Sequence, residues 1–138
     1  MSSIKNIFDV SGRAMAAQMI RLNTVASNLA NSNNISGTSE GAYRPLKPIF
    51  KTIYSNKLHN NGIASVDAIN VKELNREPER VYMPDHPKAN EDGYIFNAAV
   101  NVEEEMVDMM DASRQYQNNI EVVTTLKALT LKTINLGK

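Results

Sequence analysis

The sequence has no cysteine and no tryptophan, and only eight of its 138 residues are aromatic. The absence of cysteine excludes structural disulfides and metal sites built from thiolates. The formal net charge is zero at pH 7, because 15 basic side chains balance 15 acidic ones. We therefore expect no nucleic-acid partner and no binding to an anionic membrane surface through bulk charge.

Long apolar runs are also missing from this chain. No stretch approaches the roughly 20 apolar residues that a membrane-spanning helix needs, so we expect no membrane insertion. The first ten residues, MSSIKNIFDV, hold no uninterrupted apolar segment followed by a small-residue cleavage site. The sequence thus predicts no cleaved signal peptide.

The last third of the chain, residues 101–138, has the pattern of one long helix. Apolar or small residues recur there in alternating steps of three and four, a period near 3.5 that is typical of helices packed along a stripe. These positions are Met106, Met109, Ser113, Tyr116, Ile120 and Val123. Farther along, the stripe moves to Val122, Leu126, Leu129, Thr133 and Leu136. The helix therefore either rotates its apolar face gradually or serves two partners.

The start of this helix is marked by polar residues. Asn101 can cap it, and Glu104 follows three residues later in a capping-box arrangement. The three glutamates at 103–105 could form a metal-binding carboxylate cluster. A simpler explanation is that their negative charges complement the positive end of the helix dipole.

Residues 4–31 carry a second long amphipathic pattern. Its stripe runs without a break through Phe8, Ser11, Met15, Gln18, Leu22, Val25 and Leu29. Two of these positions, Ser11 and Gln18, are polar. They either face solvent or a polar group of a neighbour, or fix the register between helices.

The two terminal patterns predict a mainly α protein with a small β region. Its long N- and C-terminal helices should pair in antiparallel fashion as a coiled-coil-like core. We expect an N-terminal helical arm at 1–31, a loop and small β-rich middle region at 32–100, and a C-terminal helical arm at 101–138. The middle should loop out beyond the helices. One pair of helices cannot cover a drifting stripe, so we expect exposed apolar surface that marks an interaction site.

The middle region has strand and turn signals. We predict a short strand at 49–54, a half-exposed strand within 63–74, a turn at 59–62 and a hairpin across 80–99. Pro45 and Pro48 exclude a helix interior or a central strand around them.

No constellation in the sequence predicts catalysis. Asp85, His86, Glu91 and Asp92 could be imagined as a metal or catalytic site, but the neighbouring prolines and Gly93 explain this segment as turns. No phosphate-binding loop, zinc-protease motif, serine-nucleophile motif or calcium loop is present. We therefore predict no catalytic, cofactor-binding or metal-binding residues, and a protein that is not an enzyme.

Three stretches together resemble one family. They are residues 11–18 (SGRAMAAQ) with 26–31 (ASNLAN), residues 104–120 (EEMVDMMDASRQYQNNI), and residues 84–94 (PDHPKANEDGY). The first two resemble the bacterial flagellar axial proteins. The third narrows the resemblance to the basal-body rod proteins, and most closely to those of the proximal rod.

This resemblance implies a structural subunit of the periplasm-spanning rod of the flagellar basal body. It implies export in an unfolded state by the flagellar type III apparatus, without signal cleavage. It also implies that the terminal arms pack with neighbouring rod subunits and adjacent basal-body proteins into a hollow shaft that transmits torque. Two alternatives stay open: a secreted coiled-coil adaptor, or another rod or hook subunit.

The two stripes supply the candidate subunit-packing residues. We expect Met109, Tyr116, Ile120 and Val123 to carry assembly, and we place Asn119 on the outer face. The full set is Phe8, Met15, Leu22, Val25, Leu29, Met106, Met109, Tyr116, Ile120, Val123, Leu126 and Leu129.

Overall fold

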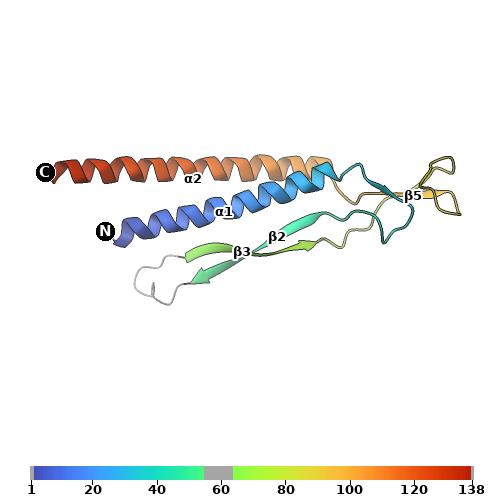
Figure 1. Cartoon of the computed structure of the whole chain (residues 1–138), viewed down its shortest axis with the longest axis horizontal. Coiled ribbons are helices and arrows are strands. Elements are labelled where there is room, and N and C mark those ends of the chain that lie inside the picture. The colour runs from blue at the N-terminus through green and yellow to red at the C-terminus, as the bar shows by residue number, and fades with distance from the viewer. Residues whose placement is uncertain (1, 55–63, 138) are drawn as a thin grey trace.

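The computed structural model describes residues 2–54 and 64–137, and it contains two long helices beside two small antiparallel sheets. Helix α1 spans Ser2–Ala30, and helix α2 spans Val102–Leu136. The two helices pack against each other in antiparallel fashion, so both chain ends lie at one end of an elongated molecule (Figure 1). The mainly helical fold with a small β part is therefore confirmed.

The first sheet has three antiparallel strands in the order β1–β5–β4. These are β1 (Ile35–Ser36), β5 (Tyr94–Asn97) and β4 (Arg80–Tyr82). The β4–β5 pair is the hairpin predicted across 80–99. This sheet lies beyond the helices, at the end of the molecule opposite the chain ends (Figure 1).

The second sheet is a hairpin of β2 (Leu46–Tyr54) and β3 (Ala64–Glu73). Strand β2 contains the predicted 49–54 strand and begins three residues earlier. Pro48 lies inside it, which a two-stranded sheet allows because each strand is an edge. The turn predicted at 59–62 falls outside the described residues.

The expectation that the whole middle loops out beyond the helices is wrong for this hairpin. Strands β2 and β3 run back along α1 and pack against it (Figure 1). The reason lies at the first residue of β2, because the Asn28 side chain of α1 bonds both the backbone N–H and the backbone C=O of Leu46. This pair of bonds directs the strand along the helix.

The apolar core of the described residues is small. Its fully buried members are mostly alanines, and the largest buried apolar side chains are Val25 and Ile95. Many large apolar side chains of α2 are instead exposed. The fold therefore leaves much of its apolar surface uncovered.

Candidate assembly surface

The functional surface begins with a buried asparagine that joins three elements. Asn28 is completely buried, and its amide nitrogen donates to the Leu46 carbonyl at 2.8 Å and to Glu105 Oε2 at 3.0 Å. Its carbonyl oxygen accepts from the Leu46 N–H at 2.8 Å and from the Tyr43 hydroxyl at 3.0 Å. All four hydrogen-bonding positions of this side chain are thus satisfied.

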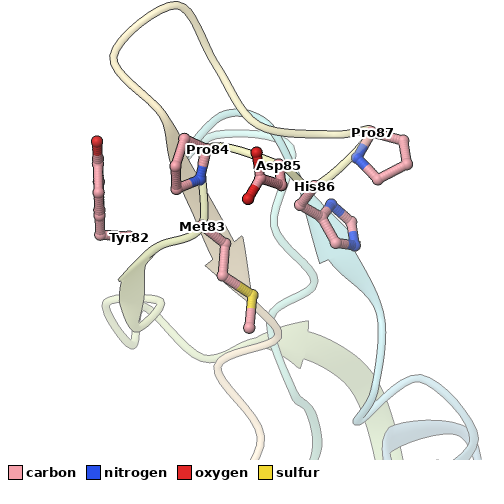
Figure 2. Close-up of a pocket in the computed structure, with 6 residues that line it drawn as sticks. All are labelled: Tyr82, Met83, Pro84, Asp85, His86 and Pro87. Carbon is pink, nitrogen blue, oxygen red and sulfur yellow. The ribbon is translucent and has the colours of Figure 1, made fainter.

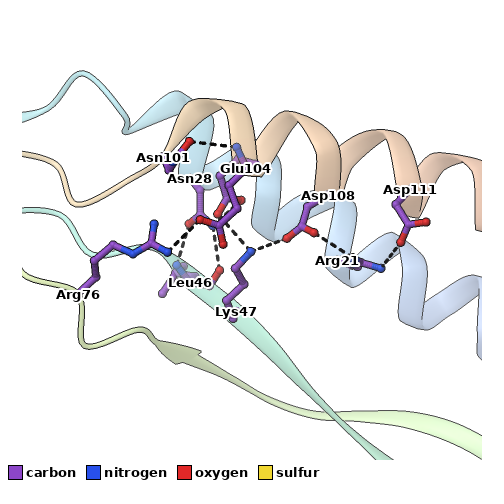
Figure 3. A network of polar contacts seen from close by, with 10 residues as sticks. Arg21, Asn28, Leu46, Lys47, Arg76, Asn101, Glu104, Asp108 and Asp111 are labelled. Atoms are coloured by element: carbon purple, nitrogen blue, oxygen red, sulfur yellow. Dashed lines mark hydrogen bonds and ion pairs between the residues drawn. The ribbon is translucent and has the colours of Figure 1, made fainter.

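A set of charged side chains surrounds Asn28, and we call it the polar cluster. Glu105, only 2% exposed, accepts from Asn28 and lies 3.3 Å from Lys47 Nζ. Lys47 also donates to Asp108, so this β2 side chain extends to two carboxylates of α2 (Figure 3). Arg21 of α1 bridges Asp108 at 3.1 Å and Asp111 at 3.0 Å. The members of the cluster are Arg21, Asn28, Lys47, Glu105, Asp108 and Asp111.

The charges of the polar cluster shift two pKa values. Burial acts to lower the pKa of Lys47, but the hydrogen bond to Asp108 and the charges of Glu105 and Asp108 outweigh it and raise the pKa above 10.5. Burial likewise acts to raise the pKa of Asp108. Hydrogen bonds from Lys47 and Arg21, with their charges, outweigh it and hold this pKa below 3.8. Both groups therefore stay charged near neutral pH and hold α1, α2 and β2 together.

The start of α2 is fixed beside this cluster. Asn101 caps the helix as predicted, because its side-chain oxygen accepts from the Glu104 N–H at 3.1 Å. The Glu104 side chain pairs with Arg76 at 2.9 Å (Figure 3). Of the three glutamates, Glu105 accepts the buried hydrogen bond from Asn28, Glu104 pairs with Arg76, and Glu103 is exposed. Within residues 2–54 and 64–137, no group of side chains could hold a metal ion.

The face that α2 turns inward differs from the predicted stripe at alternate positions. Met109, Tyr116 and Val123 are half-buried. Glu105 and Ala112 are buried beside them and Asn119 is half-buried. Of the other predicted stripe positions, Ser113 is half-buried, whereas Met106 and Ile120 are exposed. Ala112 is completely buried, which lets the helices approach closely, whereas Met106 is 55% exposed and Ile120 is 42% exposed. Placing Asn119 on the outer face was therefore wrong.

The structure distributes the candidate packing residues over three environments. Val25 is buried, and Met106, Ile120 and Leu129 are exposed. The others are half-buried: Phe8, Met15, Leu22, Leu29, Met109, Tyr116, Val123 and Leu126. Of the two polar stripe positions of α1, Ser11 is buried, and Gln18 donates to Gln115 Oε1 of α2 at 2.8 Å.

Exposed apolar side chains lie along both sides of α2, and we call them the outer flanks. One hollow of about 380 Å³ is lined by Met109, Met110, Ser113, Arg114 and Gln117. A second hollow of about 420 Å³ is lined by Asn118, Glu121, Val122, Thr125 and Leu126. The exposed apolar members are Met106, Val107, Met110, Ile120, Val122, Leu129, Leu131, Ile134 and Leu136.

Residues 84–93, which contain Asp85, His86, Glu91 and Asp92, form a pair of turns. Lys88 donates its N–H to His86 Nδ1 at 3.1 Å, and the Asn90 side chain accepts from the N–H groups of Asp92 and Tyr94. The turn interpretation of residues 84–93 is thus confirmed. Within residues 2–54 and 64–137, neither α1 nor α2 carries the continuous apolar stretch that a membrane-spanning helix requires.

Comparison with known proteins shows which proteins this chain is similar to. A family model described as "Flagella basal body rod protein" matches residues 8–36, and "Flagellar basal body rod FlgEFG protein C-terminal" matches residues 91–136. The flagellar basal-body rod protein FlgC of Salmonella typhimurium is 40% identical over 137 residues, covering 99% of both chains. FlgC of Escherichia coli O157:H7 is 39% identical over 99% of both chains, and FlgC of Aquifex aeolicus is 35% identical over 100% of both.

The chain belongs to the FlgC family of flagellar basal-body rod proteins. It is a structural subunit of the basal-body rod and not an enzyme. The two family models of the rod proteins fall on α1 with the loop after it, and on β5 with α2. In this FlgC-family chain, the two matched segments contact each other at the polar cluster.

Sequence reasoning missed the polar cluster of this FlgC-family chain. In the sequence, Asn28 stands out only as part of a family stretch, and the helix dipole alone explains Glu105. A signal was present for Glu105, since it lies four residues before Met109 and seven before Ala112, on the inner face of α2. Nothing in the sequence pointed to Lys47, because its two partners lie 58 and 61 residues away.

Proposed function

We propose that this rod subunit assembles through the outer flanks of α2, together with the half-buried stripe of α1. The observation that carries the proposal is the set of apolar side chains that α2 leaves exposed on both sides, including Met106, Ile120 and Leu129. A large exposed apolar surface of this kind is typical of an interaction site. Neighbouring subunits covering these flanks would form a hollow shaft, and the packed helices would transmit torque along it.

The two hollows on α2 support this proposal in more detail. Each is bordered by methionine or by branched apolar side chains and carries polar groups beside them. Methionine adapts its flexible side chain to different neighbours, which suits a subunit that contacts more than one partner. The drift of the apolar stripe along α2 then reflects two neighbours on two faces of one helix.

The test of this proposal is Ile120→Asp. Because Ile120 is 42% exposed, the change removes apolar surface without emptying the core. Burying an isoleucine contributes roughly 1.5–3 kcal/mol, and a charge in a dry contact adds a further cost. We expect the purified variant to melt within a few degrees of the wild type, while cells carrying it make and export the subunit but do not swim.

The matched control is Ile120→Leu, which keeps the apolar contact and should leave swimming normal. Normal motility of Ile120→Asp cells would sink the proposal. So would a loss of motility that is traced to export and not to assembly.

We further propose that the subunit leaves the cytoplasm through the flagellar type III export apparatus with its N-terminus uncleaved. The basis is the family to which the chain belongs, since resemblance to the flagellar axial proteins implies this export route. Mass spectrometry of the chain from purified basal bodies should find the N-terminus intact, apart from removal of Met1. A mature chain that starts between residues 15 and 30 would contradict this route.

A further inference from the structure

The two ends of this elongated molecule differ in shape and in charge. One end carries the turns that follow β4 and precede β5, and we call residues 82–93 the tip. The other end carries the last turns of α2 and the first turn of α1 (Figure 1). Each end has exposed apolar side chains that the described part of the chain does not cover.

The tip contains an apolar hollow. Its volume is about 450 Å³, and Figure 2 shows the six residues that line it: Tyr82, Met83, Pro84, Asp85, His86 and Pro87. Tyr82 is 63% exposed, and its ring is held edge-on to Tyr94 with the ring centres 5.1 Å apart. The Met83 N–H donates to the Gly93 carbonyl at 2.9 Å, which closes the turn behind the hollow.

The rim of the tip is acidic. The tip and the residues that lead into it, 77–92, contain five acidic side chains and only two basic ones, and three of the acidic side chains lie in the tip itself. Both basic side chains are occupied within the molecule, since Arg80 lies over the Tyr94 ring at 4.2 Å and Lys88 Nζ donates to the Ile35 carbonyl at 3.0 Å. Asp85, Glu91 and Asp92 are exposed, and no ion pair within residues 2–54 and 64–137 neutralises them.

The opposite end of the molecule is an apolar helix end with basic charge. Helix α2 is 35 residues long and α1 is 29, and both are joined at the polar cluster, so α2 extends beyond α1 (Figure 1). Every residue from 131 to 137 is exposed, and Leu136 is 88% exposed. Residues 122–138 contain three lysines and no acidic side chain. We call residues 131–136 the overhang.

We propose that the overhang of one copy docks in the tip hollow of a second copy of this chain. The inference rests on the proposed function, since it names one contact by which the subunit polymerises. Leu131 and Ile134, which lie three residues apart on one face of α2, supply the apolar side chains, and the hollow beside Tyr82 and Met83 receives them. Lys127 and Lys132 then face the unpaired carboxylates of the rim, and opposite charges of this kind select the partner and orient it.

A contact of this type joins two different patches, so it does not close on itself as a symmetric dimer does. Each copy keeps a free tip at one end and a free overhang at the other. Repetition of such a head-to-tail contact generates an open helical assembly. The contact therefore runs along the long axis of the subunit, whereas the outer flanks of α2 provide contacts at its sides.

The absence of cysteine from the chain makes a direct test possible. One copy carries Met83→Cys and the other carries Ile134→Cys, and the two full-length chains are mixed and oxidised with diamide. We expect a disulfide-linked heterodimer, and longer ladders when both substitutions are placed in one chain. Lys72→Cys, an exposed position on β3, replaces Met83→Cys as the control and should give no heterodimer with Ile134→Cys.

Charge reversal gives a second and independent test. Asp85→Lys with Glu91→Lys reverses the rim of the tip, and Lys127→Glu with Lys132→Glu reverses the helix end. Each double variant alone should associate about tenfold more weakly in sedimentation velocity, because like charges now meet. A mixture of the two variants should restore association, since each reversed end then meets a complementary one.

An experiment on assembled rods distinguishes a failure of this inference from a failure of the proposed function. Cells express the chain that carries both Met83→Cys and Ile134→Cys, and their rods are purified and oxidised. A ladder in rods supports the head-to-tail contact. Rods that contain the chain but give no ladder, with both cysteines reactive toward maleimide in the monomer, overturn it and leave the proposed function intact. A tip cysteine that links only to a different rod protein, or a mixture that fails to restore association, also overturns it. Absence of the chain from rods contradicts the proposed function itself.

Discussion

Asn28 is the residue on which the junction of α1, β2 and α2 depends most. Replacing it with alanine removes four hydrogen bonds and leaves both the Leu46 backbone groups and the Glu105 carboxylate without that partner. Because buried polar groups that lose their partners carry a desolvation cost, we expect Asn28→Ala to lower the free energy of unfolding by about 3 kcal/mol. Denaturant unfolding followed by circular dichroism measures this.

Asn23→Ala is the matched control, since Asn23 lies on the exposed face of the same helix. Its effect should stay within about 0.5 kcal/mol of the wild type. Equal losses of stability in both variants would show that Asn28 has no special role.

Asp108 should make the stability of the molecule depend on pH under acid conditions. Its folded pKa lies below 3.8, so the folded state binds this proton less readily than the unfolded state. The stabilisation is present above the unfolded pKa and is lost as the pH falls through the folded pKa. We expect Asp108→Asn to be less stable than the wild type at pH 7, with the difference shrinking below about pH 4.

Thermal melts between pH 2 and pH 7 measure this difference. Asp85→Asn is the control, because Asp85 is exposed at the tip. A difference between wild type and Asp108→Asn that stays constant across this range would contradict the assignment.

At the scale of elements, the sequence determined the helices well but not the phase of their contact. The spacing in α2 groups Met109, Tyr116 and Val123 on one stripe, and all three are half-buried in the structure. The same stripe includes Met106 and Ile120, which α1 does not cover and which stay candidates for packing against a neighbouring subunit. Glu105 takes an inner position since Asn28 and Lys47 satisfy its charge, and these partners come from residues far away in sequence.

The path of the β2–β3 hairpin could not be read from the sequence for a related reason. Its strands were predicted from β-branched and aromatic content, which indicates that a strand forms but not where it lies. The direction is fixed by the bonds between Asn28 and Leu46, which are 18 residues apart. A single side chain that bonds to a backbone at this distance leaves no periodic signal.

Gly93 is required for the turn between β4 and β5. Its φ is +79°, and a Cβ there would lie 2.9 Å from Tyr82 Cε2 and 3.2 Å from Pro84 Cβ. A left-handed backbone costs a non-glycine residue roughly 1–2 kcal/mol, and the close contacts add to this. We expect Gly93→Ala to destabilise the protein by about 2 kcal/mol and to shift the Tyr82 ring in NMR spectra.

Gly12→Ala should have the opposite effect on the stability of the protein. Gly12 lies within α1, and nothing lies within 4 Å of a Cβ added there. Alanine should therefore stabilise the helix by about 0.5–1 kcal/mol. A stabilising Gly93→Ala would show that the turn tolerates a side chain.

At the scale of the whole molecule, stability should fall from one end of the helix pair to the other. The side-chain hydrogen bonds and ion pairs described between α1 and α2 all lie within residues 18–28 and 105–115. The overhang has no such contacts and is exposed throughout. Amide hydrogen exchange of the monomer should be slow near the polar cluster and fast in 131–136.

The expected pattern is a gradient along α2, measured residue by residue by NMR. Equal protection from Val102 to Leu136 would contradict it. Protection that appears in the overhang only at high protein concentration would instead report self-association of the chain.

The position of both chain ends at one end of the molecule has a consequence for imaging. An affinity label fused to either terminus would mark the same pole of the subunit, because the start of α1 and the end of α2 both lie on that side (Figure 1). A label inserted into the turn at 88–92 would mark the opposite pole. Two gold-labelled preparations of basal bodies would then reveal whether the subunit points toward the cell interior or toward the hook, without an atomic map of the motor.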